Sequence, residues 1–531
     1  MKKYKNYIIN LLLPAFVFGS VTGIITALLV SLYKLCAKFV IDWSEKGYHL
    51  LGERLYFIPI VLIAFLGIAL LFSYIYKKIP NLKGGGIPTS IGILRGIITF
   101  KWLRNLVGIF LMSLSSFMIG VPLGNEGPSV QMGTAIGRGT VYTFAKNHKA
   151  WDRYSMTGGA CAGFSVATGA PISGILFAIE EAHQRISPTI LIVSSVSVMF
   201  ANIASEIISP LLGVSVSLFP ELTLVKLSLS NIWIPFLVGV TVGLFAVLFL
   251  YYYKVISWFF NIKLKKLHHS YKIFTVLTVT LLLGLVSFDF VSTGHELILD
   301  LFDGKVEIYM LFLALIVRST LTLSANTNKV TGGMFIPMLT LGAVLSSLLG
   351  EIIEHLFGLE HQYYIIILVM GIVACISSMM KMPLTAILFA IEALGCYENI
   401  LYVVVVSAVS FMITEIFGAK SINDTVVEDR VEELNEGKNA RVIDTYVRVR
   451  ENAFAVGKQI RDIFWPANLF VLSVKHDERR KAEVDEHGGK ALREGDILHV
   501  RYSTYDEAES RAELMAIVGN QNFMEKIAVE I

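Results

Sequence analysis

The chain has 531 residues, of which 54% are hydrophobic and 16% are charged, and its mean hydropathy is +0.64. Soluble domains carry more charge than this, so the composition predicts a membrane protein. The 45 Lys and Arg residues nearly balance the 42 Asp and Glu residues, which argues against a protein that binds nucleic acid. None of the four cysteines forms a CxxC pair, so we expect neither a disulfide framework nor a zinc site.

The N-terminus begins with Lys2, Lys3 and Lys5, and an apolar run from about residue 7 to 32 follows. This run is too long for a signal peptide and predicts an uncleaved membrane helix whose basic end is cytoplasmic. Further apolar runs lie at about 56–76, 103–121, 155–181, 189–212, 232–260, 272–292, 307–323, 334–357, 362–378, 383–395 and 400–417. We therefore expect an all-α polytopic membrane domain.

Three clusters of glycine and proline interrupt this pattern, at residues 84–88 (GGGIP), 124–128 (GNEGP) and 332–337 (GGMFIP). Lipid cannot satisfy the N–H and C=O groups of non-helical backbone, so such segments must line a cavity or lie inside the protein. The clusters predict broken helices around an internal site. Glycines that only allow close helix packing are the alternative.

An internal repeat supports the internal site. Residues 171–180 (PISGILFAIE) align with residues 383–392 (PLTAILFAIE), and seven of the ten positions are identical. Two related halves with broken helices in matching places are typical of a transporter that binds its substrate at the repeat interface. The sequence does not determine whether the second half is inverted.

The composition changes after about residue 420. Residues 424–440 read as a charged linker, and residues 441–531 as a small α+β domain. We expect strands near 442–448, 469–475 and 496–502, a helix near 454–463, and a last helix near 505–518 that closes the unit.

The three clusters also suggest a chemistry. A helix that begins after glycine and proline exposes its first N–H groups, and the positive end of its dipole attracts an anion. Arg and Lys are nearly absent from the neighbouring apolar segments. We therefore expect an anion held by backbone groups without a buried cation, which suits an ion that must also leave.

Two glutamates are candidates for proton chemistry. Glu126 lies in the second cluster, where its carboxylate either competes with the anion or caps a helix at an aqueous interface. Glu180 has a counterpart in Glu392 and is expected to serve the shared helix end. Glu181 aligns with Ala393, so it is either a proton acceptor particular to one half or a solvated surface residue.

At these residues the sequence resembles the CLC family of chloride channels and proton-coupled anion antiporters. The likeness extends over about residues 10–425, within an expected transport domain of residues 1–423. The clusters at 84–88, 124–128 and 332–337 resemble the family's GSGIP, GREGP and GGxFxP motifs, in the family's order and spacing.

The resemblance implies an inverted-repeat homodimer in which each subunit has its own anion pathway. It makes Glu126 the external gating glutamate and Glu181 the internal proton-transfer glutamate. The presence of both favours an antiporter over a channel. The implied anion-binding residues are Gly85, Gly86, Ile87, Gly124, Asn125, Gly127, Met334, Phe335 and Asn423.

The sequence departs from the family in its hydroxyl donors. Gly85 stands where most chloride-selective members have a serine, and Asn423 falls near the position of a tyrosine. The loss of both should weaken the central anion site, by roughly 0.5–1.5 kcal/mol for each neutral hydrogen bond and by more for a bond to an ion.

Two other features point away from the commonest family members. Asn125 replaces the usual arginine and also occurs in the fluoride-exporting branch. In the tail, the segments 456–458 (VGK), 462–466 (DIFWP) and 495–498 (GDIL) resemble the TrkA-C (RCK-C) domain of ion transporters. Such domains imply a possible cyclic di-AMP effector.

The leading hypothesis is a chloride/proton antiporter of a bacterial plasma membrane, with its N-terminus and its TrkA-C-like domain in the cytoplasm. Its partners are chloride or another small anion, protons and a second copy of the chain. We expect no nucleic acid, metal or resident cofactor, and transport in place of enzymatic activity. A fluoride/proton antiporter, a passive chloride channel and a sensor with a vestigial membrane part are the alternatives.

Overall fold

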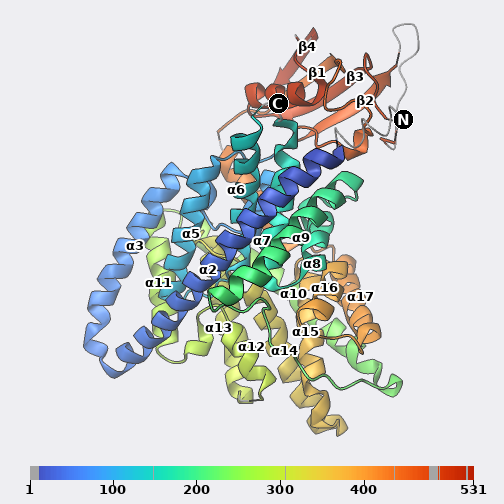
Figure 1. Ribbon diagram of the computed structural model, residues 1–531. Coiled ribbons are helices and arrows are strands. Elements are labelled where there is room, and N and C mark those ends of the chain that lie inside the picture. The colour runs from blue at the N-terminus through green and yellow to red at the C-terminus, as the bar shows by residue number, and fades with distance from the viewer. Residues whose placement is uncertain are drawn as a thin grey trace.

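The computed structural model describes residues 11–146, 149–304, 306–435, 437–476, 488–489 and 491–521, and the backbone of 524–530. Figure 1 shows a helical body with a small sheet-containing unit at one end. The expected basic segment with Lys2, Lys3 and Lys5 lies outside the described residues. Within them, eight helices are long and apolar enough to cross a membrane.

The helices of the body fall into two consecutive sets. The first set comprises α2 (Leu13–Glu53), α3 (Ile58–Lys78), α4 (Ile87–Leu94), α5 (Trp102–Ile119), α6 (Glu126–Phe144), α7 (Asp152–Thr168), α8 (Pro171–Phe177) and α9 (Pro188–Leu211). The second set comprises α10 (Trp233–Trp258), α11 (His269–Gly284), α12 (His295–Phe302), α13 (Ile308–Thr327), α14 (Phe335–Phe357), α15 (Tyr364–Met379), α16 (Pro383–Glu392) and α17 (Ile400–Ile416).

Helix α2 is longer than the sequence predicted, because it continues past residue 32 to Glu53 and has 41 residues. At 1.5 Å per residue it is about 60 Å long, roughly twice the thickness of a hydrocarbon core. It runs diagonally across the body (Figure 1). The apolar run at 155–181 is in fact broken, because Gly169 ends α7 with a φ of +71° and Pro171 begins α8.

The two halves are inverted, as the contacts between α8 and α16 show. Glu180 accepts hydrogen bonds from two backbone N–H groups in the first turn of α16, at 2.9 and 2.7 Å. Glu392 does the same in the first turn of α8, at 2.7 and 2.8 Å. Each helix therefore lies antiparallel to its counterpart, and each repeat caps a helix of the other. This is the shared helix-end role expected for Glu180.

The C-terminal unit is a four-stranded antiparallel sheet in the order β2-β3-β1-β4. Its elements are β1 (Arg441–Arg448), β2 (Leu469–Lys475), β3 (Ile497–Thr504), α19 (Glu507–Val518) and β4 (Met524–Glu530). Val447, Leu498, Val500 and Leu514 form part of a separate apolar core. The three predicted strands and the predicted last helix are confirmed.

Three predictions for the tail are wrong. The segment 454–463 forms turns and a short 3₁₀ helix, Ile460–Asp462, because Gly457 adopts a φ of +81° that interrupts an α-helix. Helix α19 does not close the unit, since β4 follows it. The charged segment after residue 423 is largely helical, because α18 (Ile422–Asn435) buries Val426 and Val427 and packs against α4.

The reciprocal caps predict a measurable stability effect. Glu392→Gln keeps the shape of the side chain but removes the charge from hydrogen bonds to the first turn of α8. Hydrogen bonds to charged groups contribute roughly 1.5–3 kcal/mol each, so the melting temperature in detergent should fall by a few degrees. Glu428→Gln is the control, because Glu428 is exposed and its carboxylate pairs with Lys420 alone among the described residues. Equal melting temperatures for the two variants would contradict the capping role.

Candidate anion and proton site

The three glycine and proline clusters meet at one point inside the body. Gly124 and Gly333 exchange two backbone hydrogen bonds, at 2.7 and 2.9 Å. A Cβ atom added to Gly127 would lie 2.7 Å from the Cα of Gly333 and 3.1 Å from the Cα of Gly86. No side chain fits between these backbones, so only glycine allows the three segments to touch.

Three helices begin around this contact: α4 at Ile87, α6 at Glu126 and α14 at Phe335. The backbone–backbone hydrogen bonds described outside the helices include none donated by the N–H of Ile87 or Phe335, and the N–H of Ile336 faces the Glu126 carboxylate. These groups have no intrahelical acceptor either, since they lie in the first turn. Three positive helix ends with open N–H groups thus converge where the sequence predicted an anion site.

The first cluster differs in detail from the predicted anion cradle. Gly84, Gly85 and Gly86 have φ values of +66°, +46° and +82°, so this turn depends on glycine at each position. The N–H of Gly86 donates to Oε1 of Gln131 at 2.6 Å and is not open to an anion. A Cβ atom on Gly85 would also lie 2.5 Å from Ile109, which explains why a serine is absent here.

Glu126 lies inside the cradle. It is fully buried, and its Oε2 would be 2.6 Å from a Cβ atom on Gly124, beside the first turn of α14. Neither carboxylate oxygen has a hydrogen-bond partner in the described structure. Burial contradicts the alternative of a cap at an aqueous interface. The side chain instead occupies space that an anion at these helix ends would need.

Phe335 fixes the start of α14. Its ring packs edge-to-face against Phe164 and Phe389, with ring centroids 5.1 and 5.7 Å apart. Met334 is the N-cap residue and is also buried. The side chains are therefore engaged in packing, which leaves the backbone of this segment as the part that faces the site.

Glu181 lies in a π-helical turn, Ala178–Ala182, that directly follows α8. It is 1% exposed, which contradicts the alternative of a solvated surface residue. The side-chain amide of Asn423 donates to Glu181 Oε1 at 2.9 Å, and Oε2 has no partner in the described structure. The predicted anion ligand Asn423 therefore contacts the candidate proton carrier.

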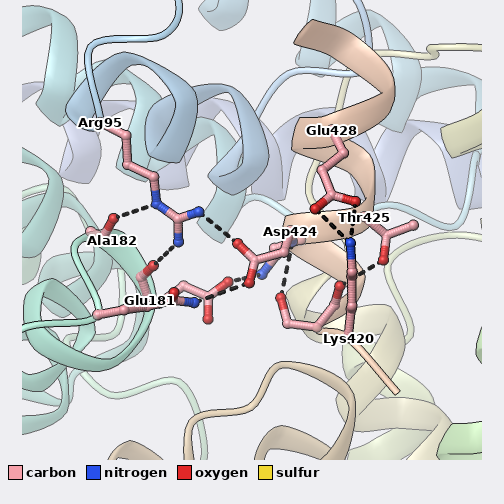
Figure 2. Close-up of polar contacts among 10 residues, drawn as sticks. Arg95, Glu181, Ala182, Lys420, Asp424, Thr425 and Glu428 are labelled. Atoms are coloured by element: carbon pink, nitrogen blue, oxygen red, sulfur yellow. Dashed lines mark hydrogen bonds and ion pairs between the residues drawn. The ribbon is translucent and has the colours of Figure 1, made fainter. Parts of the chain in front are cut away.

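Arg95, at the end of α4, holds the Glu181 turn in place, as Figure 2 shows. Its guanidinium donates to the carbonyl oxygens of Glu181 and Ala182, both at 2.9 Å. It also pairs with Asp424 on α18 at 2.8 Å. One side chain thus joins α4, the π-helical turn at Ala178–Ala182 and α18. Sequence reasoning missed Arg95, because its partners are far from it in the chain.

The expectation that no buried cation lies near the clusters is wrong. Arg430 of α18 is 6% exposed and lies against the first cluster, where a Cβ atom on Gly84 would come within 2.4 Å of its Nη2. Sequence reasoning missed Arg430 because it belongs to the segment interpreted as a linker.

Comparison with known proteins supports the fold and the site together. The family model described as voltage gated chloride channel matches residues 66–415, about two thirds of the chain. The chain belongs to this CLC family. Helices α4, α6 and α14 lie within the matched residues, and so do Glu126 and Glu181.

Three solved structures show the same CLC fold. The X-ray crystal structure of a slow cyanobacterial Cl⁻/H⁺ antiporter has 25% identity and a TM-score of 0.71, and the match covers 79% of this chain and 99% of that chain. A eukaryotic CLC transporter has 18% identity and a TM-score of 0.65, covering 78% and 74%. A CLC-type fluoride/proton antiporter has 18% identity and a TM-score of 0.61, covering 76% and 96%.

Proposed function

We propose that this CLC chain exchanges chloride for protons. The observation that carries the proposal is the pair of buried glutamates, Glu126 among the helix starts and Glu181 in the π-turn. An ionised carboxylate is costly to bury without partners, and three of their four oxygens have none in the described structure. Both side chains are therefore suited to taking up and releasing protons.

The anion and the proton compete for one space in this proposal. When Glu126 is ionised, its carboxylate occupies the N–H cradle at the start of α14. When it is protonated, its affinity for the positive helix ends falls, and an anion can replace it. Glu181 then exchanges protons with the opposite side, and Asn423 orients its carboxyl group.

Chloride is the proposed anion and fluoride is the alternative. The 25%-identical neighbour is a Cl⁻/H⁺ antiporter, which supports chloride. Asn125 resembles the fluoride branch, and Gly85 lacks the hydroxyl of most chloride-selective members. Parallel chloride and fluoride efflux from the same liposomes distinguishes the two, since a strong fluoride preference contradicts the chloride proposal.

Removing either titratable group should separate the two fluxes. In liposomes, Glu126→Gln should abolish proton movement driven by a chloride gradient, because the amide cannot carry the proton. Glu181→Gln should also stop proton movement, while chloride flux continues. Simultaneous chloride-electrode and pH recordings measure both. The exposed Glu428→Gln should retain coupling. Intact proton pumping in Glu126→Gln would overturn its role, and chloride flux without proton flux in the unmodified protein would indicate a channel.

We further propose that two copies assemble in the plasma membrane of a bacterium, with the N-terminus and the C-terminal unit in the cytoplasm. The antiparallel pair α8 and α16 supports self-association, since it exposes Ile172 and Leu384 at matching positions of the two repeats. An apolar face of this kind is covered by lipid or by a second copy.

We propose a regulatory role for the C-terminal unit, and its contacts with the membrane body support this role. Phe464, from the segment that resembles TrkA-C, is only 7% exposed and belongs to the apolar core of the membrane body. Its ring centroid lies 4.4 Å from those of both Tyr154 and His183. Arg185 lies over the same ring at 4.8 Å.

Polar contacts surround this aromatic anchor. Arg153 of α7 donates to the carbonyl oxygen of Trp465 at 2.6 Å and pairs with Glu513 of α19 at 2.9 Å. The hydroxyl of Tyr154 donates to the carbonyl oxygen of Asp462 at 2.6 Å. His183 is two residues after Glu181, so the anchor lies beside the turn that carries the proposed proton carrier.

Weakening the anchor should therefore alter coupling. Phe464→Ala removes the ring contacts, so amide hydrogen exchange in residues 178–185 should become roughly tenfold faster, and the transport rate should change. Phe470→Ala is the matched control, because Phe470 is 66% exposed on β2 of the same unit. If both variants exchange and transport like the unmodified protein, the unit does not act through this contact.

A nucleotide effector is a separate proposal for the same unit. Calorimetry on the full chain in detergent, with cyclic di-AMP as the probe, tests it. Saturable heat that changes the transport rate would support regulation through the TrkA-C-like domain, and no heat at high concentration would exclude this nucleotide.

A further inference from the structure

Arg430 is a buried cation that lies near carboxylates but outside ion-pair distance of them. It forms no ion pair with any described carboxylate, although it is only 6% exposed. Its Nη1 donates to the hydroxyl of Thr89 in α4. Its Nη2 reaches only the carbonyl oxygen of Gly85, at 3.4 Å, and its Nε has no partner. A charge buried in this way costs several kcal/mol unless a partner is supplied.

The nearest carboxylates on α18 are bound elsewhere. Glu433 pairs with Lys83 at 2.5 Å and with Lys329 at 2.6 Å. Although burial raises the pKa of Glu433, these two lysines hold that pKa at about 2. Asp429 accepts a hydrogen bond from the hydroxyl of Tyr253 at 2.7 Å. Lys83, Lys329 and Arg430 thus face two carboxylates, Glu433 and Asp429, so this group has one more positive than negative charge.

Two other buried cations show how this chain stabilises a structural charge. Lys34 donates to three backbone carbonyl oxygens, at 2.8, 3.2 and 3.4 Å. The terminal nitrogens of Arg318 also bind three carbonyl oxygens, at 2.7, 2.7 and 3.1 Å, although its Nε is unpartnered too. Arg430 has one distant carbonyl oxygen in place of three. Its environment is not that of a structural cation.

Arg430 also lies where an ion can arrive. It lines a small cavity of about 20 Å³ together with Thr89, Lys83 and Glu433. That volume holds one water-sized occupant. Lys83 and Glu433 also line a neighbouring cavity of about 830 Å³, whose wall includes Lys329 and reaches Tyr505 of the C-terminal unit. Four lysines and three carboxylates line this larger cavity, so a small positive excess favours anions near Arg430.

We propose that Arg430 binds the transported anion at the end of the pathway that faces the C-terminal unit. The ligand class is a small monovalent inorganic anion, held by the guanidinium N–H groups beside Gly84 and Gly85. The charged donors of Arg430 take over from the hydroxyl donors that are missing at Gly85 and Asn423. This inference rests on the proposed anion transport, and it adds a ligand that is a side-chain cation.

Chloride binding to the full chain in detergent tests the site, with calorimetry in a buffer whose only halide is the added chloride. The neutral variants R430M and R430Q should each weaken chloride binding by about tenfold or more. R430K retains the charge without the fork of donors and should weaken it less. Lys420→Met is the control for net charge, because exposed Lys420 precedes the same helix, and its affinity should not change.

Thermal stability separates a ligand from a structural residue. Without chloride, R430M or R430Q should melt at or above the temperature of the unmodified protein, because an uncompensated buried charge is gone. Chloride should then raise the melting temperature of the unmodified protein but hardly that of the neutral variants. A lower melting temperature with unchanged chloride affinity would overturn the proposal. If the unmodified protein binds and transports no anion at all, the proposed function itself fails.

Discussion

The contact among Gly86, Gly127 and Gly333 is the constraint on which the rest of the structure depends. It brings three backbones so close that a single Cβ atom would separate them. Because the segments touch, the starts of α4, α6 and α14 point at one place, where their first N–H groups and helix dipoles favour an anion. The reciprocal glutamate caps join the two inverted repeats, which contribute these three segments.

The charged side chains of the membrane body differ in how many of their polar atoms have partners. Glu180 and Glu392 are half-buried, and both oxygens of each carboxylate accept hydrogen bonds from a helix of the other repeat. Glu126, Glu181 and Arg430 are more deeply buried, and each has at least one polar atom without a partner in the described structure. A structural charge is stabilised when all its polar atoms have partners, whereas a group that exchanges a proton or an ion needs an atom that is free to bind it.

The sequence predicted what is local and repeated. Glycine clusters, the repeat and most membrane helices follow from short patterns, and the family resemblance supplied the roles of Glu126 and Glu181. The sequence could not predict that α18 is a packed helix, because its charged residues contact Lys83 and Gly85 from about 350 positions away. Phe464 likewise leaves its own domain for the membrane body, and no local pattern records that contact.

Helix α18 connects the anion chemistry with the proton chemistry. Asn423 and Arg430 are seven residues apart, which places them on the same face of the helix, two turns from each other. The first contacts Glu181 and the second contacts the Gly84–Gly85 turn. Arg95 ties α18 to both neighbours through Asp424. A shift of this helix therefore changes the surroundings of the proton carrier and of the anion at once. Because β1 follows α18 closely in the chain, α18 is the element through which the proposed regulation by the C-terminal unit would reach both residues.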